Sequence, residues 1–130
     1  MGTPFYLAPE LFEGKPYSDK SDMWAIGVIL YEMVSLRKPF TGLNLKDLEH
    51  KILTTKPLKV AGASRDICIV IMALLNKDPE RRLSAQQLLD MPFIRSKAKS
   101  LAITLPKKKA IAPSTKAIQA AFADKLKKII

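Results

Sequence analysis

The dominant pattern along the chain is a helical segment, from about Lys20 to Ser35, in which apolar residues cover every face of the helical wheel. Only Asp22 and Glu32 interrupt it, and Ser18 or Asp19 can cap its first turn. A helix that is apolar all round has no face suited to water, and it is therefore predicted to be buried. In a domain this small, we expect this helix to be the central element around which the others pack.

Shorter helices are predicted on both sides of this segment, because apolar residues recur there at intervals of three and four. No segment alternates between apolar and polar residues with a period of two, so the predicted fold class is all-α. These shorter helices are one that begins at Pro9 and stops at Gly14, one over 43–54 capped by Asn44, one from Arg65 to about Leu75 capped by Ser64, and one after Ser84 that closes at Met91-Pro92-Phe93.

Length and composition fit one small domain, since the chain has 130 residues and 48% of them are apolar. The single cysteine, Cys68, lies in an apolar run, which excludes a disulfide framework and predicts a small buried side chain. The longest apolar run, 23–31, is nine residues long, whereas a bilayer span needs about 20. With no transmembrane segment and no secretory signal pattern, we expect an intracellular, cytoplasmic protein, with a nuclear location left open.

The positive charge is concentrated at the C-terminal end of the chain. Residues 1–94 contain 12 Lys and Arg against 11 Asp and Glu, whereas residues 95–130 contain 10 Lys and Arg against one acid, Asp124. Such a change in composition predicts a domain boundary near Ile94. We therefore expect a folded part over 1–94, a basic linker over 95–113, and a basic amphipathic helix or mobile tail over 114–130.

Three motifs occur in the front part of the chain in a specific order. They are Gly2-Thr3-Pro4-Phe5-Tyr6-Leu7-Ala8-Pro9-Glu10, Asp22-Met23-Trp24-Ala25-Ile26-Gly27, and Asp78-Pro79-Glu80-Arg81-Arg82-Leu83-Ser84. Together they resemble the eukaryotic serine/threonine protein kinases, from the end of the activation segment through helices F to I of the C-terminal lobe. The amino-acid sequence at 19–24 and 30–33 is most similar to that of the NIMA-related kinases. The resemblance covers residues 2–94.

The resemblance implies a structural role for five residues. It implies that Glu10 pairs with Arg82, beside Trp24, and so ties the end of the activation segment to the core; the alternative is two solvated surface charges. It implies that Asp22 accepts hydrogen bonds from the backbone of the catalytic loop, although a carboxylate at a helix N-terminus can also act simply as a cap. Gly27 completes the motif that opens the F helix.

The resemblance also implies a set of substrate-binding residues. Thr3, Pro4 and Leu7 match the loop that receives the residue after the phosphorylated serine or threonine, with Thr3 bonded to the catalytic aspartate. Glu32, together with Tyr6, matches a position near the basic side of the substrate. For Glu32 the alternative is a helix-interior acid that is satisfied by Tyr6 or by a backbone group.

The catalytic motifs of the family do not occur in this sequence. There is no Gly-x-Gly-x-x-Gly, no His-Arg-Asp and no Asp-Phe-Gly, and the single histidine is His50. The resemblance implies ATP and Mg²⁺ for full-length kinases of the family. Because the motifs that bind them are missing here, no catalytic, cofactor-binding or metal-binding residue is assigned in this chain. Whether the chain is an enzyme is left open, and we expect a truncated C-terminal lobe that is inactive alone.

Two further functions stay open. One is a non-catalytic, pseudokinase-like module that binds a protein substrate or regulator through helices G to I. Loss of partner binding when Leu48 or Ile52 is changed would favour it. We also expect one face of the F helix to be exposed, which would supply an apolar surface for a partner. The 114–130 segment could cover that face. The other is binding of the basic tail to an anionic membrane surface or to nucleic acid, where the alternative is an ordinary solvated tail.

Overall fold

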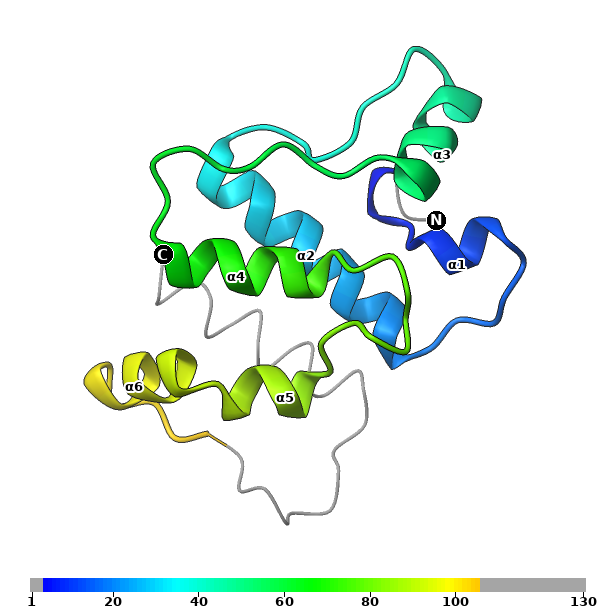
Figure 1. Ribbon diagram of the computed structural model, residues 1–130. Helices are drawn as coiled ribbons and strands as arrows, with labels where there is room; N and C mark the ends of the chain where they lie inside the picture. The colour runs from blue at the N-terminus through cyan, green and yellow to red at the C-terminus, as the bar shows by residue number, and fades with distance from the viewer. Residues whose placement is uncertain (1–3, 106–130) are drawn as a thin grey trace. The chain divides into compact units, whose positions relative to one another are not determined.

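The computed structural model describes residues 4–105, and within that range every regular element is helical (Figure 1). The all-α prediction is therefore confirmed for the described residues. The chain divides into two compact units, residues 1–83 and 84–130. The elements of the first unit are η1 (Pro4–Tyr6), α1 (Pro9–Phe12), α2 (Asp19–Ser35), α3 (Leu45–Thr54) and α4 (Arg65–Leu74), and those of the second are α5 (Ala85–Asp90) and α6 (Pro92–Ser100).

The predicted starts of the four longer helices of the sequence analysis are confirmed. The side chains of Ser18, Asn44, Ser64 and Ser84 each accept a hydrogen bond from a backbone N–H in the first turn of the helix that follows. Each cap satisfies one of the N–H groups that have no partner within the helix, which is why these short polar residues fix the helix starts.

The core of the first unit is built on α2, as predicted. Trp24 and Val28 are fully buried in it, and Tyr31 is nearly so while its hydroxyl donates to the carbonyl of Leu58 at 2.8 Å. One stripe of the same helix is open, because Ile29 is 39% exposed and Met33 37%. The expectation that one face of this helix would be exposed is therefore confirmed.

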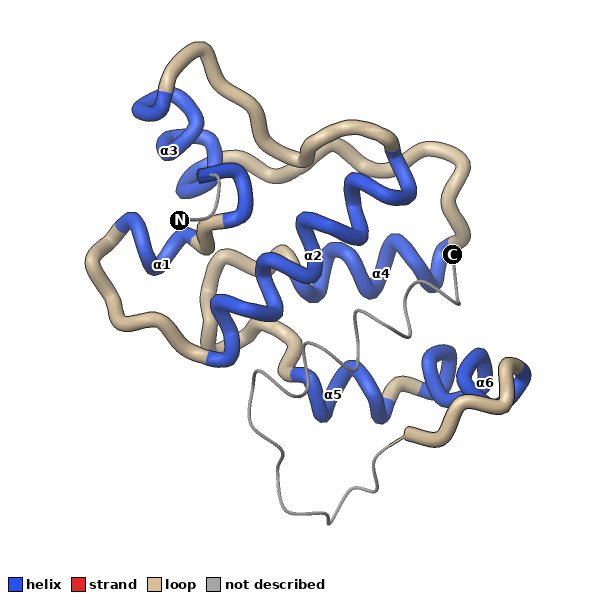
Figure 2. Tube along the Cα trace, turned by 180° about the vertical axis from the view of Figure 1, so that it is seen from behind, coloured by secondary structure: helices blue, strands red, loops and turns tan. Residues whose placement is uncertain are grey.

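Helix α4 runs beside α2, as the ribbon and the tube view both show (Figures 1 and 2). The two backbones approach closely at Gly27, where a β-carbon would lie 2.8 Å from Cβ of Leu74 and 2.9 Å from Cδ2 of Leu75. Gly27 is therefore required by packing, since no side chain fits between the helices there.

Cys68 on α4 is half-buried, so the prediction of a buried side chain is wrong. Its thiol faces the loop that precedes the helix and lies 3.7 Å from the carbonyl oxygen of Val60. The apolar run around Cys68 belongs to an amphipathic helix, on which Ile69 and Met72 are exposed.

The second unit corrects the predicted linker. Residues 95–100 belong to α6, and Pro92 occupies the first turn of this helix, where its fixed φ favours helix formation. Ala98 is buried, and Arg95 forms a 2.7 Å ion pair with Asp90. The basic residues at this point therefore lie on a helix rather than in a linker. The remainder of the predicted linker, 106–113, and the 114–130 segment lie outside the described residues.

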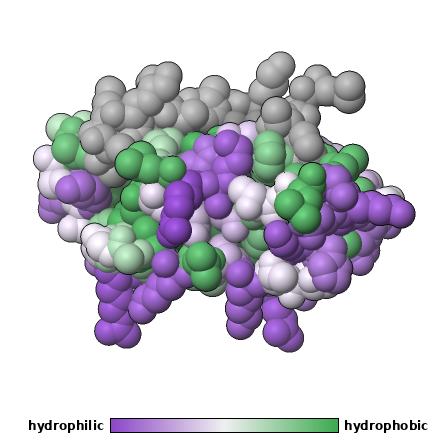
Figure 3. Space-filling model, turned by 90° about the horizontal axis from the view of Figure 1, so that it is seen from above, coloured by the Kyte–Doolittle hydropathy of each residue, from purple (hydrophilic) through white to green (hydrophobic). Residues whose placement is uncertain are grey.

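The surface is mixed in character. On the face seen in Figure 3, apolar side chains reach the surface in separate groups between long hydrophilic ones. Among the described helices, none is both long and apolar enough to cross a bilayer.

Candidate functional site

A buried ion pair joins the start of the chain to the end of the first unit. Nη1 of Arg82 donates to Oε2 of Glu10 at 2.9 Å, and Nη2 donates to Oε1 at 2.8 Å, so the pair is bidentate. Neither side chain is more than 3% exposed. The predicted contact is thus confirmed, and the alternative of two solvated charges is wrong.

The remaining polar atoms of the pair also have partners. Nη1 of Arg82 donates to the carbonyl of Lys20 at 2.6 Å, and its Nε donates to that of Asn76 at 2.8 Å. The hydroxyl of Ser21 donates to Oε2 of Glu10 at 3.0 Å. Burial alone would raise the pKa of Glu10, but the hydrogen bonds and charge of Arg82, with Ser21, outweigh it and lower that pKa below its usual value. The network therefore ties α1, the start of α2 and the turn before Leu83 together.

Aromatic rings close one side of this network. The guanidinium carbon of Arg82 lies 5.2 Å from the ring centroid of Trp24, which confirms the predicted neighbour. Trp24 stacks on Phe40 with centroids 5.8 Å apart. Nζ of Lys77 lies 4.6 Å from the Phe40 centroid and 5.5 Å from that of Trp24, and donates to the carbonyl of Ile52.

Sequence reasoning missed Phe40 and Lys77. The burial of Lys77 lowers its pKa to about 8, which is unusual for a residue that is normally solvated. The only local signal was its position directly before the Asp78-Pro79 turn.

Asp22 and Gly27 both lie on the buried part of α2. Asp22 is 3% exposed and sits in the first turn of the helix, where the dipole favours a carboxylate. This position suits a cap as well as the implied contact with a catalytic loop, so the implied role stays a prediction. Gly27 lies at the contact with α4.

Two of the predicted substrate-binding residues, Pro4 and Leu7, lie in or next to η1, which precedes Glu10 in the chain. Leu7 is 37% exposed and therefore open to a ligand. Pro4 begins η1, but its side chain is not among those described, and Thr3 lies outside the described residues.

Glu32 has two neighbours within the protein. The hydroxyl of Tyr6 donates to both of its carboxylate oxygens at 3.2 Å, and Nζ of Lys38 lies 3.8 Å from Oε1. Burial, followed by the hydrogen bond and charge of Glu32, raises the pKa of Tyr6. The contact that the sequence analysis named as the alternative for Glu32 is thus present, and a role in substrate binding stays a prediction. Lys38 also lies 5.1 Å from the Phe5 ring centroid.

Comparison with known proteins identifies the class of this fold. Residues 1–94 match the protein kinase domain family, and the chain therefore belongs to the protein kinase family. The match ends where the sequence analysis placed the boundary of the kinase-like part.

The individual relatives that the chain matches are serine/threonine kinases, and several of these relatives are NIMA-related kinases. The chain is 39% identical over 119 residues, or 90% of its length, to a Trypanosoma brucei brucei protein named as serine/threonine-protein kinase A. It is 38% identical over 97 residues to human serine/threonine-protein kinase Nek5 and 38% identical over 96 residues to mouse Nek4. The chain spans 27%, 14% and 12% of these three proteins, respectively.

Proposed function

We propose that this chain supplies the protein-substrate end of a serine/threonine kinase catalytic domain, which transfers phosphate from ATP to serine or threonine of a protein. The observation that carries the proposal is the buried Glu10–Arg82 pair, because it anchors the chain directly after η1. A loop that must present Thr3, Pro4 and Leu7 to a substrate needs such a fixed end, since misplaced contacts cost catalysis heavily.

Electrostatics support a basic substrate segment near Glu32. Its contact with Lys38 is partly exposed, and an exposed ion pair of this kind contributes only about 0–1 kcal/mol. A substrate lysine or arginine can therefore replace Lys38 at little cost. An arginine would also form two parallel hydrogen bonds to the carboxylate.

The chemistry of phosphate transfer requires groups that this sequence does not contain. A phosphate-binding loop, a metal-binding aspartate and asparagine, and an aspartate that orients the hydroxyl are the parts that hold ATP and Mg²⁺ in kinases. We therefore propose that these ligands bind residues other than the 130 of this chain, and that the chain alone has no phosphotransferase activity.

A chimera tests the proposal. The chain is fused behind the part of the human Nek5 kinase domain that precedes the matched region, and phosphorylation of a basic serine/threonine protein is measured with labelled ATP. We expect activity from the chimera and none from the 130-residue chain alone. Arg82→Ala in the chimera should abolish activity, whereas Arg81→Ala, at a side chain that is 82% exposed, should retain it. A folded chimera without activity, or robust turnover by the chain alone, would contradict the proposal.

A non-catalytic interaction module is the second candidate, and the apolar residues before and at the start of α3 favour it. Leu43 is 97% exposed and Leu45 58%. Leu48 and Ile52, which the sequence analysis chose for the test, are buried, so changing them would disturb folding rather than a surface. The test therefore moves to Leu43 and Leu45, whose replacement by serine should abolish a saturable partner complex. Binding by the basic tail concerns residues outside those described and stays a prediction.

A further inference from the structure

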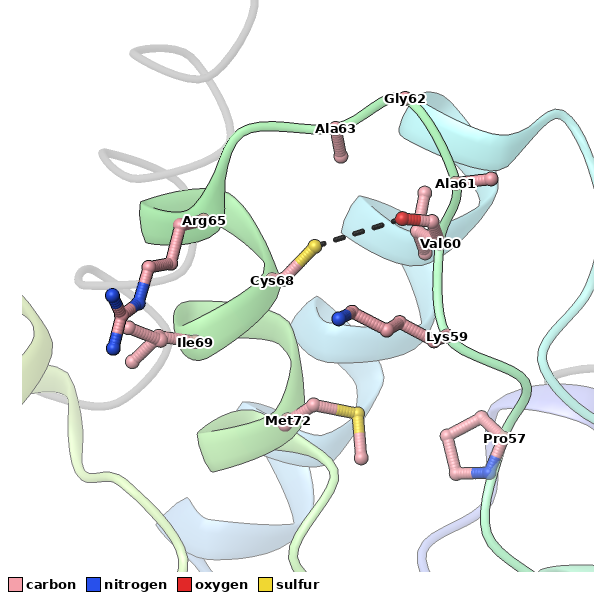
Figure 4. A pocket seen from close by; sticks show the side chains of 10 residues that line it. All are labelled: Pro57, Lys59, Val60, Ala61, Gly62, Ala63, Arg65, Cys68, Ile69 and Met72. Carbon is pink, nitrogen blue, oxygen red and sulfur yellow. Dashed lines mark hydrogen bonds between the residues drawn. The ribbon is translucent and has the colours of Figure 1, made fainter.

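An open groove lies between the loop before α4 and the outer face of that helix (Figure 4). Its volume is about 920 Å³, which is in the range of sites that bind ligands or peptide side chains. None of the residues that line it belongs to the predicted substrate-binding set. The lining consists of Pro57, Lys59, Val60, Ala61, Gly62, Ala63, Arg65, Cys68, Ile69 and Met72.

The groove is held open by contacts of its loop with the helices behind it. The carbonyl of Leu58 accepts the Tyr31 hydroxyl at 2.8 Å, and that of Val60 faces the Cys68 thiol at 3.7 Å. At Gly62 the backbone has a φ of 80°, which a glycine adopts without strain. Because the loop is held by its contacts at Leu58 and Val60, a ligand would find a preformed surface and lose little entropy in ordering it.

The lining combines exposed apolar side chains with positive charge. Ile69 is 47% exposed and Met72 42%, and methionine adapts its shape readily to a partner. Lys59 and Arg65 are both exposed, and in Figure 4 the amine of Lys59 is directed toward α4. The lining contains no carboxylate, and Asp66, the acidic residue next to Arg65, is not part of it.

Within the described part of the chain, neither Lys59 nor Arg65 has an ion-pair partner, although six of the other lysines and arginines do. That contrast, together with the apolar floor, defines the chemistry that would complement the groove. A ligand should offer carboxylates to the two cations and a bulky apolar side chain to Ile69 and Met72.

We propose that this groove binds an acidic peptide segment of a partner protein, with a leucine or phenylalanine flanked by aspartates and glutamates. The apolar side chain rests on Ile69 and Met72 and supplies affinity through burial of apolar surface. The flanking carboxylates pair with Lys59 and Arg65 and supply specificity and speed of association. This proposal is independent of the proposed catalytic role, because no step of phosphate transfer uses these residues.

The experiment uses the full 130-residue chain and a fluorescein-labelled ten-residue peptide with a central Leu-Phe pair and six flanking acids. Binding is followed by fluorescence anisotropy at near-physiological salt, where contacts with exposed charges elsewhere are weakened. Cys68 provides a second readout, since it is the only cysteine of the chain and lines the groove. Its rate of reaction with a thiol reagent should fall when the peptide is bound.

Charge reversal with a matched control locates the site. Lys59→Glu with Arg65→Glu should weaken binding about tenfold or more, because two attractive contacts become repulsive. Lys15→Glu with Lys46→Glu makes the same change in net charge at exposed positions outside the groove and should leave the affinity within about twofold. Circular dichroism establishes that all variants keep the same helical content.

Peptide variants and a nucleic acid test the predicted ligand class. Replacing Leu-Phe by Ala-Ala, or the six acids by their amides, should each weaken binding about tenfold or more. Three results would overturn the proposal. The first is an equal loss of peptide affinity in the two charge-reversal variants, and the second is a Cys68 reaction rate that the peptide does not change. The third is protection of Cys68 by the Ala-Ala peptide, or by a ten-nucleotide RNA, that equals the protection by the original peptide.

Discussion

Removing the guanidinium of Arg82 should be among the most damaging single changes in the first unit. In Arg82→Ala, Glu10 keeps its buried position, but both of its bidentate hydrogen bonds are lost. The carbonyls of Lys20 and Asn76 lose their donors at the same time, and the space beside the Trp24 ring is emptied. The change therefore leaves a buried carboxylate without its counter-ion, with the Ser21 hydroxyl as a remaining donor, as well as a cavity.

The expected loss follows from these contacts. Breaking a buried ion pair by removing one partner costs about 3–5 kcal/mol, because the remaining charge is buried from solvent and is no longer compensated by an opposite charge. The free energy of unfolding of a whole domain is typically about 5–15 kcal/mol. We therefore expect Arg82→Ala to leave the first unit marginally stable or unfolded. Arg82→Lys should lie in between, since an ammonium keeps the charge but cannot form two parallel bonds.

Urea unfolding followed by the fluorescence of Trp24 is the direct assay, because this is the only tryptophan and it lies 5.2 Å from the guanidinium carbon. Arg81→Ala is the matched control: its side chain is 82% exposed, and the loss should be below about 0.5 kcal/mol. A loss below about 1 kcal/mol for Arg82→Ala would refute the reasoning, since that is the range of surface ion pairs.

Three further predictions concern the same core. The lowered pKa of Glu10 gives a stabilisation that is complete above the unfolded-state pKa of 4.5 and is lost as the pH falls through the folded-state pKa. In Glu10→Gln, the free energy of unfolding should therefore fall less steeply as the pH drops below 4.5. Gly27→Ala should cost about 1–3 kcal/mol in urea unfolding, because the added methyl would lie 2.8 Å from Cβ of Leu74, whereas Ile29→Ala on the exposed stripe should cost less. Burial lowers the pKa of Lys77 from its ordinary value of 10.5 to about 8 in the folded state. Between these two pH values the unfolded chain binds more protons than the folded one, so the free energy of unfolding should rise with pH. This rise should be absent in Lys77→Met.

The features that sequence alone predicted well are those whose physics is local. A serine or asparagine before an apolar run caps a helix wherever the chain goes next, so Asn44, Ser64 and Ser84 could be assigned from their neighbours, and the cap of α2 could be narrowed to Ser18 or Asp19. Composition was a poorer guide, since the charge of 95–100 indicated a linker. Pro92 starts a helix there, and Lys97 and Lys99 lie in its last turn, where cations are favoured.

The Glu10–Arg82 ion pair shows why contacts between distant residues could not be predicted from local sequence patterns. Glu10 and Arg82 are 72 positions apart, and no local pattern distinguishes either of them from a solvated charge. A buried guanidinium needs fixed acceptors, and those of Arg82 come from three separate stretches of the chain. The pairing was therefore predictable only through a motif in which both residues already have a place. Phe40 and Lys77 belong to no such motif in this sequence, and the cation that lies against two aromatic rings became visible only once the folded chain brought them together.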